Sequence, residues 1–178
     1  QLPDTIVPVS RSEEAVRYLK RVNAYDAYLS GRVDIRYDFR MNRVVYLIKD
    51  RRRTVDAAGR SLVNAKPKWW RYGKSGNPFV CGTSRVGIVL EDCASACSVS
   101  SFLSGIALLG TNLQDSHLPY LRKYDRLLVA LDKDATKKGL QLVRRLQAIR
   151  PTSLVVLNKD VKDMTDDERK RTFERYIP

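Results

Sequence analysis

The sequence is poor in the residues that build zinc and thiol sites. It has three cysteines, none of them in a CxxC pair, and a single histidine, His117. These residues cannot supply the usual cysteine and histidine ligand set, so we expect no structural zinc in this chain. No motif places His117 beside a serine and an acid, and we expect it to be a surface or helix residue. Cys93 and Cys97 are predicted to be small buried thiols on a helix, in a reducing compartment.

Long hydrophobic runs and a signal peptide are also missing. No apolar stretch approaches the roughly 18 residues of a membrane-spanning helix. We therefore expect an intracellular, cytoplasmic protein that has no membrane partner. The 178 residues are enough for one cored domain, with or without a small appended lobe.

Acidic residues are clearly outnumbered by basic ones. The chain has 33 lysines and arginines against 20 aspartates and glutamates, which gives a net charge of +13. This excess favours a polyanionic partner, because basic side chains release the counterions condensed on phosphates. A solvated basic surface that only aids solubility is the alternative, and we favour nucleic acid over it.

The first half of the chain, to about Arg85, combines one expected helix with polar strands. Apolar residues recur at helical spacing between the capping-box pair Ser10 and Glu13 and a stop at Gly31. Residues 43–48 are strand-like, and a turn at 50–53 followed by a return through 54–59 predicts an antiparallel hairpin. Residues 66–74 show no regular pattern but are basic and aromatic. Neighbouring side chains of an extended segment face opposite ways, so we expect at most one of Trp69 and Trp70 to be exposed.

Short apolar runs alternate with expected helices in the second half. The runs are residues 86–90, 106–109, 127–131 and 154–157, and helices are expected at 94–102, 113–124 and 135–150. This alternation predicts a parallel sheet covered on both faces. Acidic residues stand at or just past the carboxyl ends of three of these four runs: Glu91, Asp132, Asp134, Asp160 and Asp163. Such a pattern is typical of a metal cluster along one edge of a sheet.

The aspartates at 132 and 134 are the most informative pair. They end the apolar run at 127–131 and directly precede an expected helix. Side chains at i and i+2 of a strand point the same way, so we expect two carboxylates on one side of the strand tip. Carboxylates this close repel each other unless a cation lies between them, and ligand sets made of oxygen suit Mg²⁺. An acidic residue at a strand end that only caps a helix is the alternative for each position alone.

These residues belong to an ordered series that resembles the Toprim domain of primases and topoisomerases. The series extends over nearly the whole chain and is similar to the catalytic core of bacterial and phage primases. A topoisomerase would also need a separate domain with a nucleophilic tyrosine, for which the chain has no room. In order, the matching segments are Arg43–Asp50, Gly59–Leu62, Ala65–Lys68, Glu91, Ile106–Thr111, Asp132–Ala135 with Gly139, and Lys162–Asp163.

The resemblance implies an α/β fold, with a Toprim core whose mostly parallel central sheet is flanked by helices. Residues 1–84 would form a smaller, basic N-terminal α+β lobe, and residues 85–178 the Toprim metal-binding domain. The implied activity is that of a DNA primase: RNA primer synthesis by nucleotidyl transfer on a single-stranded DNA template, from NTPs. If the chain is encoded by a phage, the compartment would be the host cytoplasm.

The resemblance also implies roles for single residues. Asp132 and Asp134 would ligate Mg²⁺ or Mn²⁺ at two or more sites, with Glu91 and Asp163 completing the metal site. Glu91 acting as a general base is an equally open role. Basic and aromatic residues would bind nucleotide phosphates or template: Arg60, Lys66, Lys68 and Trp70. In-line phosphoryl transfer needs these two kinds of group, because divalent ions and basic side chains offset the charge that it develops.

One position departs from the Toprim pattern. The usual signature has an aspartate four residues after the glutamate, where this chain has Ser95. Either Asp92 contributes the missing carboxylate, or the site binds one metal fewer or binds it more weakly. Full primases also carry a zinc-binding template-recognition domain and act with a replicative helicase. We expect both outside this chain, which we interpret as an excised core rather than a compact enzyme.

Two other functions compete with primer synthesis. A Toprim nuclease would use the same carboxylates to activate water against a phosphodiester, but would give no reason for Arg60 or Lys68. A non-catalytic basic module would bind nucleic acid or a replication partner, and its function would survive loss of Asp132.

Overall fold

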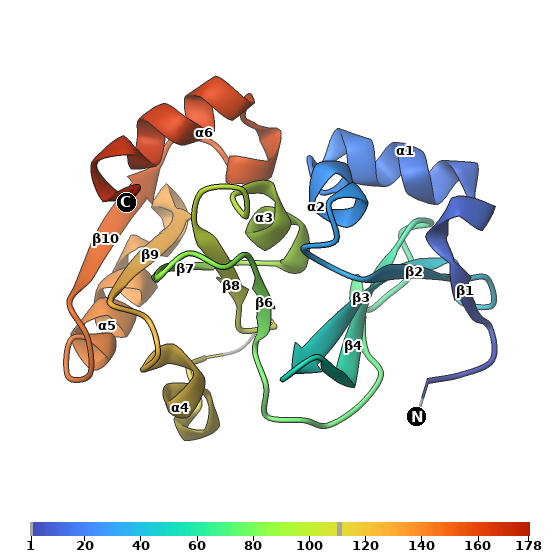
Figure 1. Ribbon diagram of the computed structural model, residues 1–178, viewed down its shortest axis with the longest axis horizontal. Coiled ribbons are helices and arrows are strands. Elements are labelled where there is room, and N and C mark those ends of the chain that lie inside the picture. The colour runs from blue at the N-terminus through green and yellow to red at the C-terminus, as the bar shows by residue number, and fades with distance from the viewer. Residues whose placement is uncertain (1, 110–111) are drawn as a thin grey trace.

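The computed structural model describes residues 2–109 and 112–178, and for positions 132 and 133 it describes the backbone alone. The chain forms two five-stranded sheets that lie side by side (Figure 1). Among the described residues, every helix is too short or too polar to cross a membrane.

The first sheet is antiparallel and has the strand order β1-β2-β3-β4-β5. Its strands are β1 (Ile6–Pro8), β2 (Ile35–Asp38), β3 (Arg43–Asp50), β4 (Arg53–Ser61) and β5 (Trp69–Arg71). The predicted hairpin is confirmed, since β3 and β4 pair along their length and turn between Asp50 and Arg53. The segment expected to be irregular contains β5, which pairs with residues 58–60 of β4.

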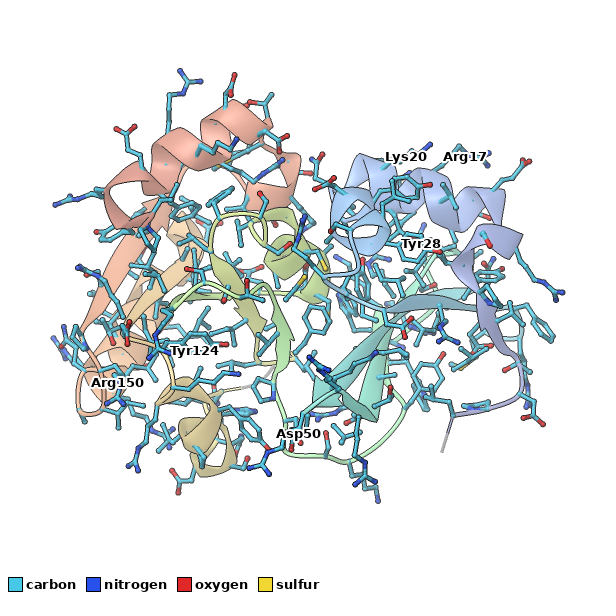
Figure 2. All side chains as sticks on the ribbon, viewed as in Figure 1. Arg17, Lys20, Tyr28, Asp50, Tyr124 and Arg150 are labelled. Atoms are coloured by element: carbon cyan, nitrogen blue, oxygen red, sulfur yellow. The ribbon has the colours of Figure 1, made fainter. Side chains whose placement is uncertain are left out.

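The helix expected between Ser10 and Gly31 is broken in two. A 3-10 turn (Val9–Arg11) precedes α1 (Glu13–Arg21), and α2 (Tyr25–Leu29) follows after Asn23, whose φ is +60°. The capping-box assignment was wrong by two residues, because the Ser12 hydroxyl accepts the Ala15 amide at 3.1 Å. Apolar residues of α1 pack onto the sheet, while Arg17 and Lys20 project from its outer side (Figure 2).

The second sheet has the order β10-β9-β7-β8-β6, with four parallel strands and an antiparallel edge strand, β6. The mostly parallel sheet predicted from the alternation of runs and helices is therefore confirmed. Its strands are β6 (Phe79–Cys81), β7 (Val86–Leu90), β8 (Ser104–Ala107), β9 (Arg126–Asp132) and β10 (Thr152–Leu157). Its helices are α3 (Cys93–Ser98), α4 (Leu118–Leu121), α5 (Thr136–Leu146) and α6 (Asp166–Phe173), with 3-10 turns at Asp115–His117, Lys133–Ala135, Val161–Asp163 and Glu174–Tyr176.

Two apolar layers cover this sheet, one on each face. Leu128 and Ala130 of β9 pack toward α6, and Val129 and Leu131 pack toward α4 and α5. Alternation along one strand thus serves both layers, which is why the run at 127–131 is continuously apolar. Helix α3 packs so closely on β8 that a Cβ at Gly105 would lie 2.1 Å from the Ala96 carbonyl oxygen.

Helix α3, which connects β7 to β8 of the second sheet, also packs against the apolar core of the first sheet (Figure 1). Cys93 and Cys97 are free, buried thiols, as predicted, in the same apolar cluster as Tyr46 and Ile48 of β3. His117 was expected to be a surface or helix residue, and it is in a 3-10 helix but only 3% exposed, so the helix alternative is the one confirmed. The shared cluster fixes how the first sheet faces the carboxyl edge of the second.

Candidate active site

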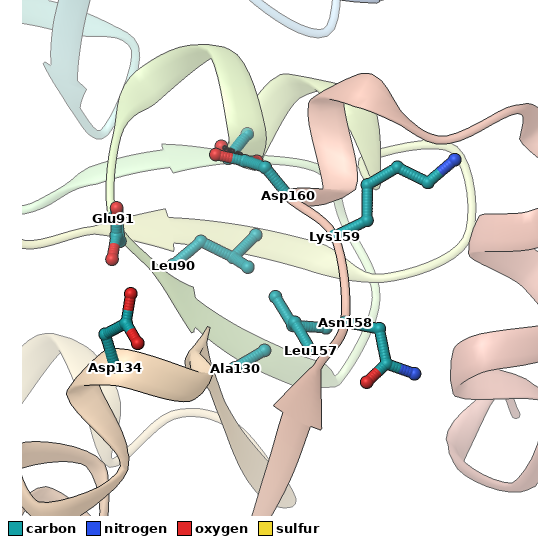
Figure 3. Close-up of a pocket in the computed structure, with 9 residues that line it drawn as sticks. Leu90, Glu91, Ala130, Asp134, Leu157, Asn158, Lys159 and Asp160 are labelled. Carbon is teal, nitrogen blue, oxygen red and sulfur yellow. Dashed lines mark hydrogen bonds between the residues drawn. The ribbon is translucent and has the colours of Figure 1, made fainter.

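A cavity of about 180 Å³ opens at the carboxyl edge of the second sheet (Figure 3). The last residues of β7, β9 and β10 lie close to one another there, because Val89 is in register with Val129, and Asp132 with Leu157. The floor is apolar and the wall carries oxygen atoms. The lining residues are Leu90, Glu91, Ser95, Ala130, Asp134, Leu157, Asn158, Lys159 and Asp160.

The carboxylates of Glu91 and Asp134 point toward one another across this cavity (Figure 3). Glu91 directly follows β7, and Asp134 is in the 3-10 turn Lys133–Ala135 that connects β9 to α5. Both residues are exposed, so ions and substrates can reach them from solvent. Two of the four carboxylates predicted from the sequence therefore lie at one site.

The other two predicted carboxylates, those of Asp132 and Asp163, are not among the residues described in the cavity wall. The backbone of Asp132 ends β9 at the same edge, while its side chain lies outside the described residues. Asp163 is exposed in the turn Val161–Asp163 and is not in the cavity wall, whereas Asp160 is. Among the described side chains, no three acidic, histidine or cysteine residues are close enough together to hold a metal ion. Carboxylate oxygens such as those of Glu91 and Asp134 are of the kind that Mg²⁺ and Mn²⁺ prefer as ligands.

A second group of charged residues borders the cavity on the side of α3. The Lys162 Nζ atom lies 3.2 Å from Asp92 Oδ2 and 2.6 Å from Asp160 Oδ2. The Ser95 hydroxyl is 3.1 Å from Asp160 Oδ1, and the Ser95 amide donates to Asp92 Oδ1 at 2.9 Å. Burial by itself raises the pKa of Asp160, but the hydrogen bond and charge of Lys162 outweigh it and lower that pKa below its usual value.

Two grooves extend from Glu91 toward the first sheet. One, of about 330 Å³, is bordered by Lys68, Trp69, Glu91 and Lys138. The other, of about 120 Å³, is bordered by Trp69, Trp70, Arg71 and Glu91. Glu91 thus stands where the acidic edge of one sheet meets basic and aromatic residues of the other.

Of the predicted nucleic-acid-binding residues, Lys68 borders the large groove and Trp70 the small one, whereas Arg60 and Lys66 border neither. Lys66 and Lys68 are exposed, and Trp70 is 42% exposed, whereas Trp69 is partly buried against the core. The expectation that at most one tryptophan is exposed is confirmed. Arg60 is opposite Trp69 in the β4–β5 pair and donates to the Ser61 carbonyl.

Arg60 and the acidic edge also act on a common buried group, the phenol of Tyr18. Burial raises the pKa of Tyr18 to about 12, the Tyr46 hydroxyl and Arg60 act in the opposite direction, and Asp92 adds to the rise. Arg60 and Asp92 are therefore both close enough to Tyr18 for their charges to change its pKa.

Two buried charged residues, Arg43 and Asp56, hold the aromatic segment in place, and neither role was predicted. Arg43, 2% exposed, donates to the carbonyls of Gly59 at 3.0 Å, Pro67 at 2.7 Å and Lys68 at 3.1 Å. Asp56, 4% exposed, accepts Arg71 Nε at 2.7 Å and the amide of Ser75 at 3.2 Å. A basic or acidic residue in a polar strand carries no signal that its charge points inward.

Comparison with known proteins finds likeness in structure alone. No family model matches the sequence, and no curated protein matches it. The E. coli primase catalytic core is similar over 96% of this chain and 73% of its own, with a TM-score of 0.69 and 18% identity. A DNA primase domain from Pseudomonas aeruginosa matches over 92% of this chain and 60% of its own, with a TM-score of 0.62 and 17% identity.

A third solved structure is a DnaG primase catalytic domain bound to single-stranded DNA. It matches over 94% of this chain and 59% of its own, with a TM-score of 0.60 and 19% identity. The chain therefore has the fold of the DnaG primase catalytic core, and it spans about three fifths of the second and third of these proteins. The α/β architecture with an N-terminal antiparallel lobe, implied by the Toprim resemblance, is confirmed.

Proposed function

We propose that this chain, with its DnaG-core fold, is the catalytic core of a DNA primase that joins ribonucleotides on single-stranded DNA. The observation that carries the proposal is the position of Glu91 and Asp134. They face each other at the carboxyl edge of a parallel sheet, beside grooves bordered by lysine and tryptophan. Open α/β sheets hold their ligands at this edge.

Glu91, Asp132 and Asp134 would hold Mg²⁺ or Mn²⁺ in this proposal, with Asp163 as a further predicted ligand. When bound, the metal supplies charge neutralisation at the attacking and leaving oxygens of an in-line displacement. Glu91 keeps its second proposed role, accepting the proton of the attacking hydroxyl, because it is exposed at the mouth of all three cavities.

Basic and aromatic residues would bind the substrates. Lys68, just before β5, and Lys138, in α5, both border the large groove, so both can attract the triphosphate of an incoming nucleotide. Trp70 is exposed enough to stack on a base, a contact worth about 1–3 kcal/mol. Arg60 and Lys66 would extend the basic surface along the template phosphates.

The remaining assignments follow from this activity. We propose residues 1–84 as the basic lobe and residues 85–178 as the metal-binding domain, with β6 reaching from the former into the sheet of the latter. The partners would be single-stranded template and NTPs, together with a zinc-binding template-recognition domain and a replicative helicase outside this chain. The activity belongs in the cytoplasm, or in the host cytoplasm if the chain is encoded by a phage.

Replacing one carboxylate of the facing pair tests the proposal. Wild-type protein, Asp134→Asn and Asp167→Asn are incubated with single-stranded template, labelled NTPs and Mn²⁺. Asp167 is an exposed residue of α6 outside the cavity, so its substitution is a matched change of charge. We expect labelled oligomers from wild type and Asp167→Asn. In Asp134→Asn we expect the rate of oligomer synthesis to fall about 100-fold or more, as in enzymes that lose one group that stabilises charge in the transition state.

The same assay separates the competing functions. Cleavage of the template without NTPs would identify a nuclease, and binding with neither product would identify a non-catalytic module. Synthesis that survives the double substitution Asp132→Asn and Asp134→Asn would rule out the metal-dependent polymerase.

A further inference from the structure

Lys162 forms an unusual contact for a lysine, because it bridges two carboxylates from different parts of the chain. Asp92 lies 70 residues before it and Asp160 two residues before it. The side chain of Lys162 is 22% exposed, that of Asp92 18% and that of Asp160 32%. Two carboxylates brought this close would repel each other if no positive charge lay between them.

The oxygen atoms of both carboxylates already have partners. Asp92 Oδ1 accepts the Ser95 amide, which caps the start of α3, and Asp92 Oδ2 contacts the ammonium group. Asp160 Oδ1 contacts the Ser95 hydroxyl at 3.1 Å and the Lys162 amide at 3.2 Å, and Asp160 Oδ2 contacts the ammonium group. A divalent ion could bind this pair only by displacing one or more of these donors.

The bridge lies at the wall of the cavity that holds Glu91 and Asp134. Asp160 and Ser95 line that cavity, and Asp92 follows Glu91 and borders both grooves. Ser95 is neutral, so it adds a hydrogen-bond donor but no negative charge. In this part of the site the excess of negative charge is offset by the ammonium group of a residue of the chain itself.

We propose that Lys162 takes the place of a divalent ion between Asp92 and Asp160, which leaves Glu91, Asp132 and Asp134 to hold the metal. Lys162 is then a positioning residue that fixes the start of α3 against the turn after β10. The identity of the remaining metal site rests on the proposed function. The exclusion of metal from the Asp92–Asp160 pair rests only on the contacts described above.

Counting bound Mn²⁺ tests this inference without measuring activity. Mn²⁺ binding is titrated by electron paramagnetic resonance for wild type, Lys162→Met, Lys170→Met and the double variant Asp92→Asn with Lys162→Met. We expect Lys162→Met to bind one Mn²⁺ more than wild type, and the double variant to return to the wild-type number. Lys170→Met removes an equal charge from an exposed residue of α6 outside this cavity, and we expect no gain.

An unchanged number in folded Lys162→Met would overturn the inference. If circular dichroism shows that this variant does not fold, the inference is tested instead by counting Mn²⁺ bound to the double variant Asp92→Asn with Asp160→Asn, which keeps Lys162. An unchanged Mn²⁺ number supports the inference, and the loss of an ion overturns it. A protein that makes no primer yet gains an ion in Lys162→Met would sink the proposed function and leave this inference standing.

Discussion

Single charged residues make contacts in the folded protein that their residue type does not predict. Arg43 is almost fully buried and donates to three carbonyls, and Lys162 bridges two carboxylates. Burying a charge is costly unless its polar atoms find partners, and the Arg43 Nε atom has none among the described residues. In the sequence both residues look like members of a general basic excess.

His117 gives a prediction at this scale, on the dependence of stability on pH. Its Nδ1 atom accepts the Gln114 amide at 3.0 Å, and burial, with the charges of Arg71 and Arg145, lowers the pKa of His117. The unfolded chain therefore takes up a proton at a higher pH than the folded one. The stability that neutral His117 contributes is complete above about pH 6.5 and is lost as the pH falls through its lower, folded value.

Urea unfolding of wild type and His117→Gln between about pH 8 and pH 5 measures this effect. We expect the free energy of unfolding to fall more steeply with decreasing pH in wild type than in the variant. Parallel pH profiles would show that His117 titrates alike in both states.

Short elements are decided by neighbours that the local sequence does not contain. The turn at Asn23 ends α1 early, and the Asn23 side chain donates to the Lys162 carbonyl at 2.7 Å, far along the chain. Strand β5 has three residues and exists because β4 offers it a partner. The β3–β4 hairpin was predictable because its alternation and its turn lie within one continuous segment.

Arg43 provides a prediction for the segment that precedes β5. Replacing Arg43 with Met removes the guanidinium donor of the Pro67 carbonyl and one donor of the Lys68 carbonyl, which also accepts the Ser61 amide. We expect the free energy of unfolding to fall by about 2–3 kcal/mol, within the range for unsatisfied buried polar groups. Because Lys68 borders the large groove, affinity for single-stranded DNA should fall as well.

Arg40→Met is the matched control, since Arg40 is exposed and lies in the connection between β2 and β3, just before Arg43. Denaturant unfolding and fluorescence anisotropy with a labelled strand measure the two effects. Equal stability of the two variants would argue against an anchoring role for Arg43.

At the scale of the whole molecule, net charge and the groove between the two sheets act together. The charge of +13 makes binding to a polyanion sensitive to salt, because each phosphate contact releases condensed counterions. For about five contacts to a single strand, the slope of log K against log salt would be about −3.5, and affinity would fall roughly 100-fold between about 50 and 200 mM salt.

Lys138→Ala should make that slope shallower by about 0.7, because one phosphate contact is removed. Lys137→Ala is the control: Lys137 precedes Lys138 in α5 but does not border the groove. Binding that is independent of salt, or equal slopes for the two variants, would contradict a path for the strand through this groove.

The sequence by itself determined the overall architecture and the carboxyl edge that carries the acids. Apolar runs such as residues 127–131 and the residues that follow them are local patterns, and a parallel sheet converts them directly into an edge. The likeness to the primase core confirms that architecture, whereas the metal and nucleotide roles of the predicted residues stay predictions.

Only the tertiary structure decided which charges meet. Asp92 was left open by the sequence as a stand-in for the carboxylate missing at Ser95, and in the structure it pairs with Lys162 and caps α3. Asp160, rather than Asp163, lines the cavity. Contacts of this kind join residues far apart in the chain or depend on the course of a single turn, and neither periodicity nor charge count contains that information.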